Sequence, residues 1–285
     1  MEAIQRMGTD GGAHAGCVYD KSECVTGGNG ERMAEERGAT TNSASSDRGV
    51  FITLEGPDGA GKSTQALLLV ERLRARGHEV IALREPGGTA ISEKIRAILL
   101  DPANAEMTDE CELLLYEASR AQLVHQVIEP ALGRGAIVVC DRYFDSTYAY
   151  QAGARGLDDG LVRRANRLGS CGVRPNLTLV LDMDPACAFS RAAADGEDRL
   201  EAEGLAFQRR VRAAYLRLST EEPERVHVVD AAGSFDEVVA RIDAELAGVL
   251  PATGEAAGRT ALDSGAAGCA SPEGGCVSPE GEVAR

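Results

Sequence analysis

Tryptophan is absent from this chain of 285 residues, and the other aromatic side chains make up only 4% of it. Long apolar runs are absent too. No stretch approaches the roughly 20 consecutive apolar residues of a membrane-spanning helix, so we expect no such helix. The first 30 residues lack the apolar core, about 7–15 residues long, of a secretory signal, and we therefore expect a cytoplasmic protein.

Basic side chains are in deficit. Thirty Lys and Arg residues stand against 45 Asp and Glu residues, which gives a formal net charge of −15. This balance argues against a protein that binds nucleic acid through a broad basic surface. A small phosphorylated ligand is still allowed, because a pocket can be locally positive inside a negative protein.

Closely spaced cysteine pairs are also missing. None of the eight cysteines forms a C-x-x-C pair, and the seven-residue offset of Cys17/Cys24 and Cys269/Cys276 is wider than the usual spacing of zinc ligands. We interpret these four as reduced thiols. The remaining four lie in apolar or helical contexts and are predicted to be small buried residues: Cys111, Cys140, Cys171 and Cys187.

Composition divides the chain into three parts. Residues 1–48 and 251–285 are rich in small and polar residues and show no apolar periodicity. Because neither segment can bury enough apolar surface to offset its ordering entropy, both are predicted to be disordered extensions. Residues 49–250 then form one domain of ordinary size.

Within this domain, short β-branched runs alternate with helical patterns. The predicted strands are 51–54, 80–83, 136–140, 177–181 and 226–229. The predicted helices are 62–76, 91–100, 109–132 and 235–249, and a further helix is expected to begin with residues 146–151. Repeated β-α-β units with apolar strands indicate an α/β fold, a five-stranded parallel sheet with helices on both faces.

A phosphate-binding loop connects the first strand to the first helix. Gly56-Pro57-Asp58-Gly59-Ala60-Gly61-Lys62-Ser63 matches the pattern G-x-x-x-x-G-K-[ST], and Thr64 follows it. Its glycines let backbone N–H groups approach phosphate oxygens, and the start of the helix adds further donors. Lys62 is suited to the β- and γ-phosphates, and the hydroxyl of Ser63 to Mg²⁺. The loop predicts a P-loop NTPase fold that binds ATP or GTP with Mg²⁺.

Other polar residues indicate a second substrate. A guanine-reading N-K-x-D motif, expected of a GTPase, is missing. Tyr116 and Arg120 lie four residues apart on a predicted helix and therefore share a face. An aromatic plane beside a forked donor suits a pyrimidine, through ring stacking and a hydrogen bond to a carbonyl.

Four segments give the chain a family resemblance: the phosphate loop, 84–89 (Arg-Glu-Pro-Gly-Gly-Thr), 141–151 with its Asp-Arg-Tyr start, and Arg155-Gly156. Over about residues 50–250 the chain resembles bacterial thymidylate kinases. The resemblance implies transfer of the γ-phosphate of ATP to dTMP, with Mg²⁺, by a cytoplasmic homodimer that binds neither nucleic acid nor membrane. Two alternatives remain: a related P-loop kinase for another nucleoside monophosphate, and a non-catalytic nucleotide-dependent switch.

The resemblance also implies roles for single residues. Arg96 would hold the 5′-phosphate of the acceptor, Asp58 would meet its 3′-hydroxyl and Tyr150 would crowd the ribose 2′-position. Residues 151–160 resemble a small, mobile lid from which Arg155 supplies charge to the transition state. The residues expected to act in catalysis are Lys62, Arg142 and Arg155, and those expected to bind dTMP are Asp58, Arg96, Tyr116, Arg120, Arg142, Ser146, Thr147, Tyr150 and Gln151. The roles of Asp141, Arg191 and Arg199 stay open.

Overall fold

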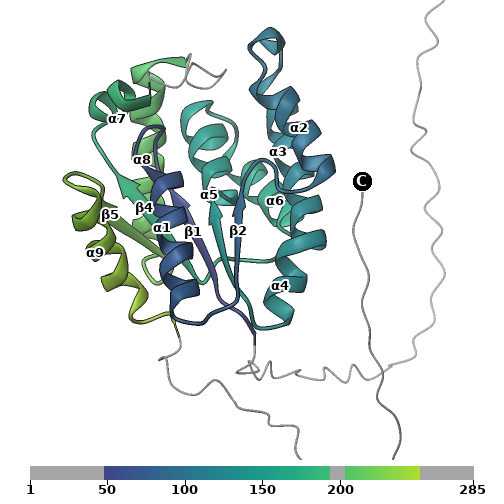
Figure 1. Ribbon diagram of the computed structural model, residues 1–285. Coiled ribbons are helices and arrows are strands. Elements are labelled where there is room, and N and C mark those ends of the chain that lie inside the picture. Colours follow the sequence, from purple (N-terminus) through teal and green to yellow (C-terminus); the bar gives the residue numbers. More distant parts are fainter. Residues whose placement is uncertain (1–47, 193–202, 251–285) are drawn as a thin grey trace, which may run out of the picture. The chain divides into compact units, whose positions relative to one another are not determined.

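A five-stranded, wholly parallel sheet forms the frame of the computed structural model, which describes residues 48–192 and 203–250. The strands lie in the order β2-β3-β1-β4-β5. Their bounds are β1 Phe51–Glu55, β2 Val80–Arg84, β3 Ile137–Asp141, β4 Leu177–Asp182 and β5 Val226–Asp230. The five predicted strands and their parallel arrangement are confirmed (Figure 1).

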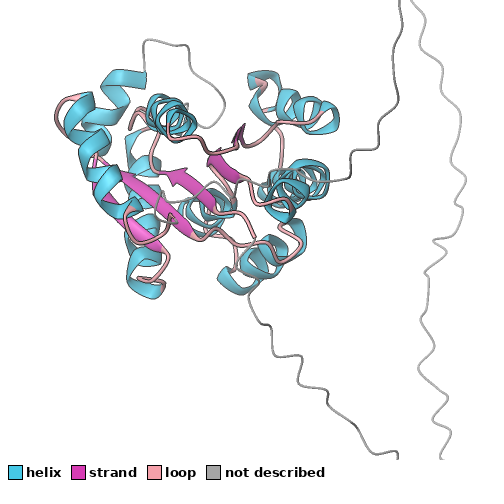
Figure 2. Ribbon diagram, turned by 60° about the horizontal axis from the view of Figure 1, so that its bottom comes forward, coloured by secondary structure: helices cyan, strands magenta, loops and turns pink. Residues whose placement is uncertain are grey.

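Helices cover both faces of this sheet, as predicted (Figure 2). Successive residues of β1 point to opposite faces. Ile52 and Leu54 pack in the apolar cluster that includes residues of α1 (Lys62–Ala75) and α9 (Phe235–Leu246). Phe51 packs instead with residues of the π-helical segment η2 (Val124–Ile128) and of α4 (Glu129–Gly133). The sheet is therefore apolar on both sides, which explains the apolar runs of its inner strands.

The helix predicted at 109–132 is divided into three parts. It begins as α3 (Asp109–Leu123), passes through η2 and ends as α4. Upstream lie α2 (Ala90–Leu100), which matches the prediction at 91–100, and the short 3₁₀ turn η1 (Pro102–Asn104). Thr89 caps α2 and Thr108 caps α3, each by accepting a hydrogen bond from a backbone N–H of the first turn.

The helix expected to begin with residues 146–151 is present as α5 Phe144–Thr147, continued by the π-helical segment η3 Tyr148–Ala154. Three further helices lie where none was predicted: α6 Asp159–Gly169, α7 Pro185–Ala192 and α8 Leu205–Glu221. The predicted lid, residues 151–160, is partly helical. Residues 151–154 continue the helical path of α5, packed on α8, and α6 begins at Asp159. The glycine content of this segment indicated a loop, but packing on α8 favours a helical conformation for residues 151–154.

Three of the four middle cysteines are exposed, against the prediction that all four are buried. Cys140 is buried in β3, whereas Cys111, Cys171 and Cys187 are exposed on α3, after α6 and on α7. Each of the three lies on a helix surface or in a turn. A helical sequence context does not show which face of a helix is buried. No helix in the described ranges is long and apolar enough to cross a membrane. The predicted extensions, apart from Arg48, lie outside the described residues, as do Cys17, Cys24, Cys269 and Cys276.

The carboxyl ends of β1 and β3 position the site. The chain leaves the central strand β1 into the phosphate loop and α1, then crosses to the edge strand β2. Its neighbour β3 ends at Asp141 and leads into Arg142 and α5. Parallel α/β sheets bind ligands at this edge, beside the strand at which the chain changes direction.

Candidate active site

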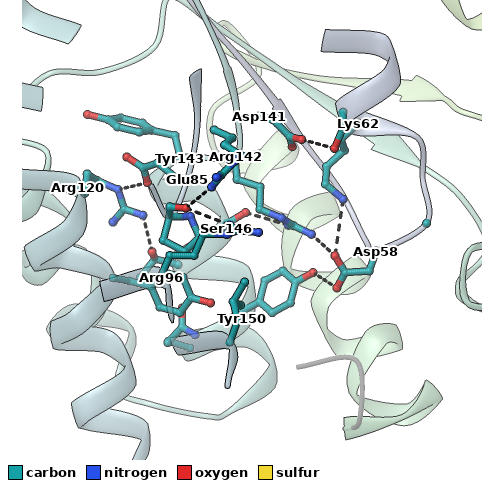
Figure 3. A pocket seen from close by; sticks show the side chains of 18 of the residues that line it. Asp58, Lys62, Glu85, Arg96, Arg120, Asp141, Arg142, Tyr143, Ser146 and Tyr150 are labelled. Carbon is teal, nitrogen blue, oxygen red and sulfur yellow. Dashed lines mark hydrogen bonds and ion pairs between the residues drawn. The ribbon is translucent and has the colours of Figure 1, made fainter. Parts of the chain in front are cut away.

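One cavity of about 560 Å³ joins the phosphate loop to all nine residues predicted to bind the acceptor. Fourteen residues from the sequence prediction line it: Asp58, Gly59, Gly61, Lys62, Ser63, Thr64, Arg96, Tyr116, Arg120, Arg142, Ser146, Thr147, Tyr150 and Gln151. Figure 3 shows labelled side chains that reach the cavity from different elements: Lys62 from α1, Arg96 from α2, Arg120 from α3, Ser146 from α5 and Tyr150 from η3. Gly56, Pro57 and Ala60 belong to the loop but do not line the cavity, and Arg155 lies outside its lining.

The phosphate loop depends on its glycines. A Cβ at Gly56 would lie 2.5 Å from the carbonyl oxygen of Leu181, and one at Gly59 would lie 2.0 Å from that of Ala188. Both residues have positive φ angles, 135° and 80°. Only glycine allows the loop to pack this closely on β4 and α7 while its backbone faces the cavity.

Lys62 is buried at the start of α1. Its Nζ donates a hydrogen bond to the carbonyl oxygen of Pro57 at 2.8 Å and lies 3.8 Å from Oδ1 of Asp58. Burial and the nearby charge of Arg142 lower the pKa of Lys62 to about 8. An anion in the cavity would stabilise the charged form of this amine.

Asp58 joins the phosphate loop to the acceptor side (Figure 3). Its carboxylate pairs with Nη2 of Arg142 and accepts a hydrogen bond from the Tyr150 hydroxyl at 2.8 Å. Burial opposes ionisation of Asp58, but Arg142 and Lys62 outweigh it and lower the pKa of this carboxyl. A carboxylate inside a phosphate site needs a cation or a hydroxyl donor to compensate its charge, and the structure supplies both.

Arg142 occupies an unusual backbone position. Its φ is 70°, in the left-handed region, and its N–H donates to the carbonyl oxygen of Leu54 at 3.0 Å. The guanidinium donates to Ser146 Oγ at 3.1 Å and lies over the ring of Tyr150, 5.2 Å from its centroid. A strained backbone held by this many contacts is typical of a functional residue.

Magnesium fits beside Ser63. Ser63 Oγ donates to Oδ2 of Asp141 at 2.5 Å, and Oδ1 of Asp141 is buried without a hydrogen-bond partner. Hydroxyl and carboxylate oxygens are the ligands that Mg²⁺ prefers, and this ion usually takes only one or two of them from a protein. The described residues hold no cluster of three or more His, Cys, Asp or Glu side chains that could bind a metal on its own. Phosphate oxygens and water would have to complete the coordination.

Arg120 is fully buried between acidic partners. Its Nε donates to Oε2 of Glu85 at 2.8 Å and its Nη1 to Oε1 of Glu117 at 2.6 Å. Nη2 donates to Thr147 Oγ1 at 2.9 Å, and Nη1 also reaches Asn166 Oδ1 at 3.4 Å. The side chain is therefore rigidly oriented before any ligand binds, and one Nη2 hydrogen remains for the cavity.

The other acceptor residues are similarly held. Arg96 donates from Nη1 to the carbonyl oxygen of Pro86 at 3.0 Å. Tyr116 is half-buried on α3, on the same helix face as Arg120, and packs against the apolar cluster that contains Tyr150. Gln151 is buried and donates to Oε1 of Glu112 at 2.6 Å.

Arg155 points to three carboxylates. It contacts Glu112, Asp109 and Glu203 and lies over the ring of Phe207, 5.1 Å from its centroid. Asp182, at the end of β4, accepts two hydrogen bonds from Arg212. Arg199 and the side chain of Arg191 lie outside the described residues.

Two buried carboxyls beside the cavity were missed from the sequence. Glu85 lines the cavity, and burial raises its pKa to about 7. Glu55 ends β1 and accepts hydrogen bonds from the Tyr143 N–H and the hydroxyls of Ser146 and Tyr215; burial raises its pKa to about 7 as well. The signals available were the position of each carboxyl at the end of a strand and, for Glu85, its place in the 84–89 segment that carries the family resemblance.

Comparison with known proteins agrees with this geometry. A family model described as thymidylate kinase matches residues 54–242. A thymidylate kinase of Deinococcus radiodurans is 52% identical over 196 residues, 68% of this chain and 95% of that relative. One of Pseudomonas putida is 49% identical over 203 residues, 71% of this chain and 97% of that relative.

The chain belongs to the thymidylate kinase family. A crystal structure of thymidylate kinase from Ehrlichia chaffeensis matches with a TM-score of 0.57 and 33% identity, covering 70% of this chain and 98% of that one. The P-loop NTPase fold expected from the sequence is thereby confirmed. As in the sequence resemblance, the match to thymidylate kinases excludes both predicted extensions.

Proposed function

We propose that this chain transfers the γ-phosphate of ATP to dTMP, giving ADP and dTDP. The observation that carries the proposal is the single cavity that holds both the phosphate loop and the acceptor set of Arg96, Tyr116 and Arg120. Membership of the thymidylate kinase family supports it over a non-catalytic switch, which needs no second substrate site.

The reaction needs positioning and charge neutralisation rather than a covalent intermediate. An oxygen of the dTMP phosphate attacks the γ-phosphorus of ATP. The bond from that phosphorus to the β–γ bridging oxygen breaks, and its electron pair stays on ADP. Mg²⁺, when bound, would neutralise charge on the β- and γ-phosphates.

Residues of this chain would supply the remaining positive charge and hold the acceptor. Lys62 contributes charge on the donor side, and Arg142 lies between the donor and acceptor sides, where it pairs with Asp58. Arg155 would contribute from the lid. On the acceptor side, Arg96 would hold the phosphate of dTMP and Tyr116 would stack on its base. Arg120 would donate to a base carbonyl from a side chain already fixed by Glu85 and Glu117.

Formation of ADP with ATP and Mg²⁺, measured with and without dTMP, tests the proposed function. We expect ADP to form in proportion to added dTMP, with dTDP as the second product. Nucleotide binding without dTMP-dependent ADP formation would support the nucleotide-dependent switch instead.

We also propose that residues 49–250 suffice for activity, and that the protein is a cytoplasmic homodimer without a nucleic-acid partner. The absence of apolar periodicity in both extensions supports the first point, and the acidic composition argues against a nucleic-acid partner. The homodimer rests on the family resemblance alone. Deletion of residues 1–48 and 251–285 should leave a cooperatively unfolding, active enzyme. Loss of cooperative unfolding would show that an extension packs on the domain.

A further inference from the structure

Glu112 is a buried carboxylate with no role in the sequence prediction. It lies in the first turn of α3, and none of its surface is exposed. Its Oε1 accepts hydrogen bonds from Nε2 of Gln151 at 2.6 Å and from Nε of Arg155 at 3.3 Å. Its Oε2 accepts from Nη2 of Arg155 at 3.2 Å. The same carboxylate therefore binds Gln151, which lines the acceptor cavity, and Arg155, which belongs to the lid.

The three carboxylates around Arg155 differ in exposure. Asp109 and Glu203 are 43% and 34% exposed, and water therefore screens their attraction for the guanidinium. Glu112 is 1% exposed by side chain, and the Arg155 side chain only 12%. The buried carboxylate has the strongest hold on Arg155, because its charge is the least solvated.

The two ends of the guanidinium have different partners. Nε and Nη2 donate to the two oxygens of Glu112, as in a forked arginine–carboxylate pair, and Nε also lies 3.3 Å from Oδ1 of the exposed Asp109. Nη1 donates to the more exposed Glu203. Nη1 is therefore the end that can exchange a carboxylate for a phosphoryl oxygen while the other end stays bound.

We propose that Glu112 is a positioning residue that holds Arg155 and Gln151 together, so that Arg155 turns its Nη1 toward the transferring phosphoryl group without losing its anchor. Glu203 is the partner that Nη1 gives up. Gln151 and Arg155 lie four residues apart on η3 and just after it, and α3 carries Tyr116 one turn beyond Glu112. Glu112 thereby ties the acceptor cavity to the lid arginine. The inference rests on the proposed function, since it assigns the arginine a phosphoryl target.

A double-mutant cycle tests the coupling. Glu112→Gln keeps the side-chain shape but places an amide NH₂ against the donors of Arg155 or Gln151. It should lower kcat with dTMP about 10–100-fold and raise the KM for dTMP about threefold, with little change in the KM for ATP. In an Arg155→Ala background the same substitution should lower kcat by less than about threefold. Equal losses in the two backgrounds would overturn the proposal, because a merely structural role is additive.

Two further variants keep the proposal falsifiable even if Glu112→Gln fails to fold. Asp109→Asn removes an exposed carboxylate from the same guanidinium and should leave kcat within about twofold of wild type. Glu203→Gln removes the exchangeable partner and should leave kcat unchanged or raise it up to about threefold. A tenfold fall for Glu203→Gln would overturn the proposal, since Glu203 rather than Glu112 would then position the arginine.

The wild-type chain is measured in the same assay. If it forms no ADP with dTMP, the proposed function fails and the role of Glu112 fails with it. If it forms ADP but Glu112→Gln retains the wild-type kcat, only the role of Glu112 is overturned.

Discussion

The hydroxyl of Tyr150 donates a hydrogen bond to Oδ2 of Asp58 across 2.8 Å, joining the helical segment after β3 to the phosphate loop after β1. The resemblance to thymidylate kinases placed these two residues at the sugar of the acceptor, one near the 2′-position and one near the 3′-hydroxyl. Their direct contact agrees with a shared location.

Tyr150 should therefore help to reject ribonucleotides. Tyr150→Ala removes the ring and should narrow the preference for dTMP over its ribose counterpart by about tenfold in kcat/KM. Tyr150→Phe keeps the ring, loses the hydroxyl that contacts Asp58 and Arg142, and should keep the preference. An unchanged ratio for the alanine variant would assign Tyr150 to core packing, where it already contacts the ring of Phe207.

Arg120 should be essential for stability as well as for binding. Arg120→Ala leaves Glu85 and Glu117 buried without their cation and should lower the free energy of unfolding by roughly 3–5 kcal/mol. Arg134→Ala is the matched control, because it breaks an exposed ion pair with Glu79 and should cost less than about 1 kcal/mol. Urea denaturation of the two variants would measure both values, and similar costs would contradict the assignment.

Glu85 should make stability depend on pH. Its pKa is raised from 4.5 to about 7, so the folded chain binds this proton more tightly than the unfolded chain does. The stabilisation is complete below the unfolded pKa and is lost as the pH rises through about 7. Relative to Glu85→Gln, which does not titrate, the wild type should lose up to about 3 kcal/mol of unfolding free energy between pH 5 and pH 8.

Glu93 provides the control for this pH experiment. A backbone hydrogen bond from Gly88 lowers its pKa, so its contribution is present above 4.5 and is lost only at lower pH. The difference between wild type and Glu93→Gln should stay flat from pH 5 to pH 8. A flat difference for Glu85→Gln as well would mean that Glu85 stays ionised beside Arg120 throughout.

Arg155 should act mainly in the transition state. The phosphate loop contains no arginine of its own. In related NTPases, an arginine that contacts the transferring phosphoryl group raises kcat by about 10³–10⁵. Arg155→Ala should lower kcat and kcat/KM for dTMP by similar factors and change the Kd for ATP little. Arg155→Lys should recover only part of the rate, because an ammonium lacks the planar fork. A kcat within about twofold of wild type for the alanine variant would contradict this role and assign it to Arg142 or Arg199.

Local patterns predicted the strands and the phosphate loop because their physics is local. A strand-loop-helix with glycines at fixed spacing constrains its own backbone. The spacing of Phe207, Val211 and Leu218 also carried a helical signal for α8 that could have been used. By contrast, Arg120 is fixed by Glu85 and Thr147, which lie 35 and 27 residues away in sequence. No local pattern reports such contacts.

The conformations of Arg142 and Arg155 could not be predicted from the sequence either. The left-handed backbone of Arg142 results from contacts with β1 and the phosphate loop. Arg155 appeared to lie in a glycine-rich loop, whereas the packing of η3 on α8 brings it against Glu112 and Phe207. Both depend on tertiary packing, which only the folded chain reveals.

Comparison of kcat/KM across an acceptor panel, with ATP and Mg²⁺, tests the central claim most directly. The account predicts the highest value for dTMP, because the Tyr116 and Arg120 pair suits a pyrimidine with a carbonyl acceptor. It predicts a lower value for dUMP and no turnover of purine monophosphates. For dCMP, loss of the hydrogen bond from Arg120 should raise the free energy of the transition state by roughly 1.5–3 kcal/mol, which lowers kcat/KM about 10- to 150-fold. Turnover of dCMP or AMP as fast as dTMP would contradict the account.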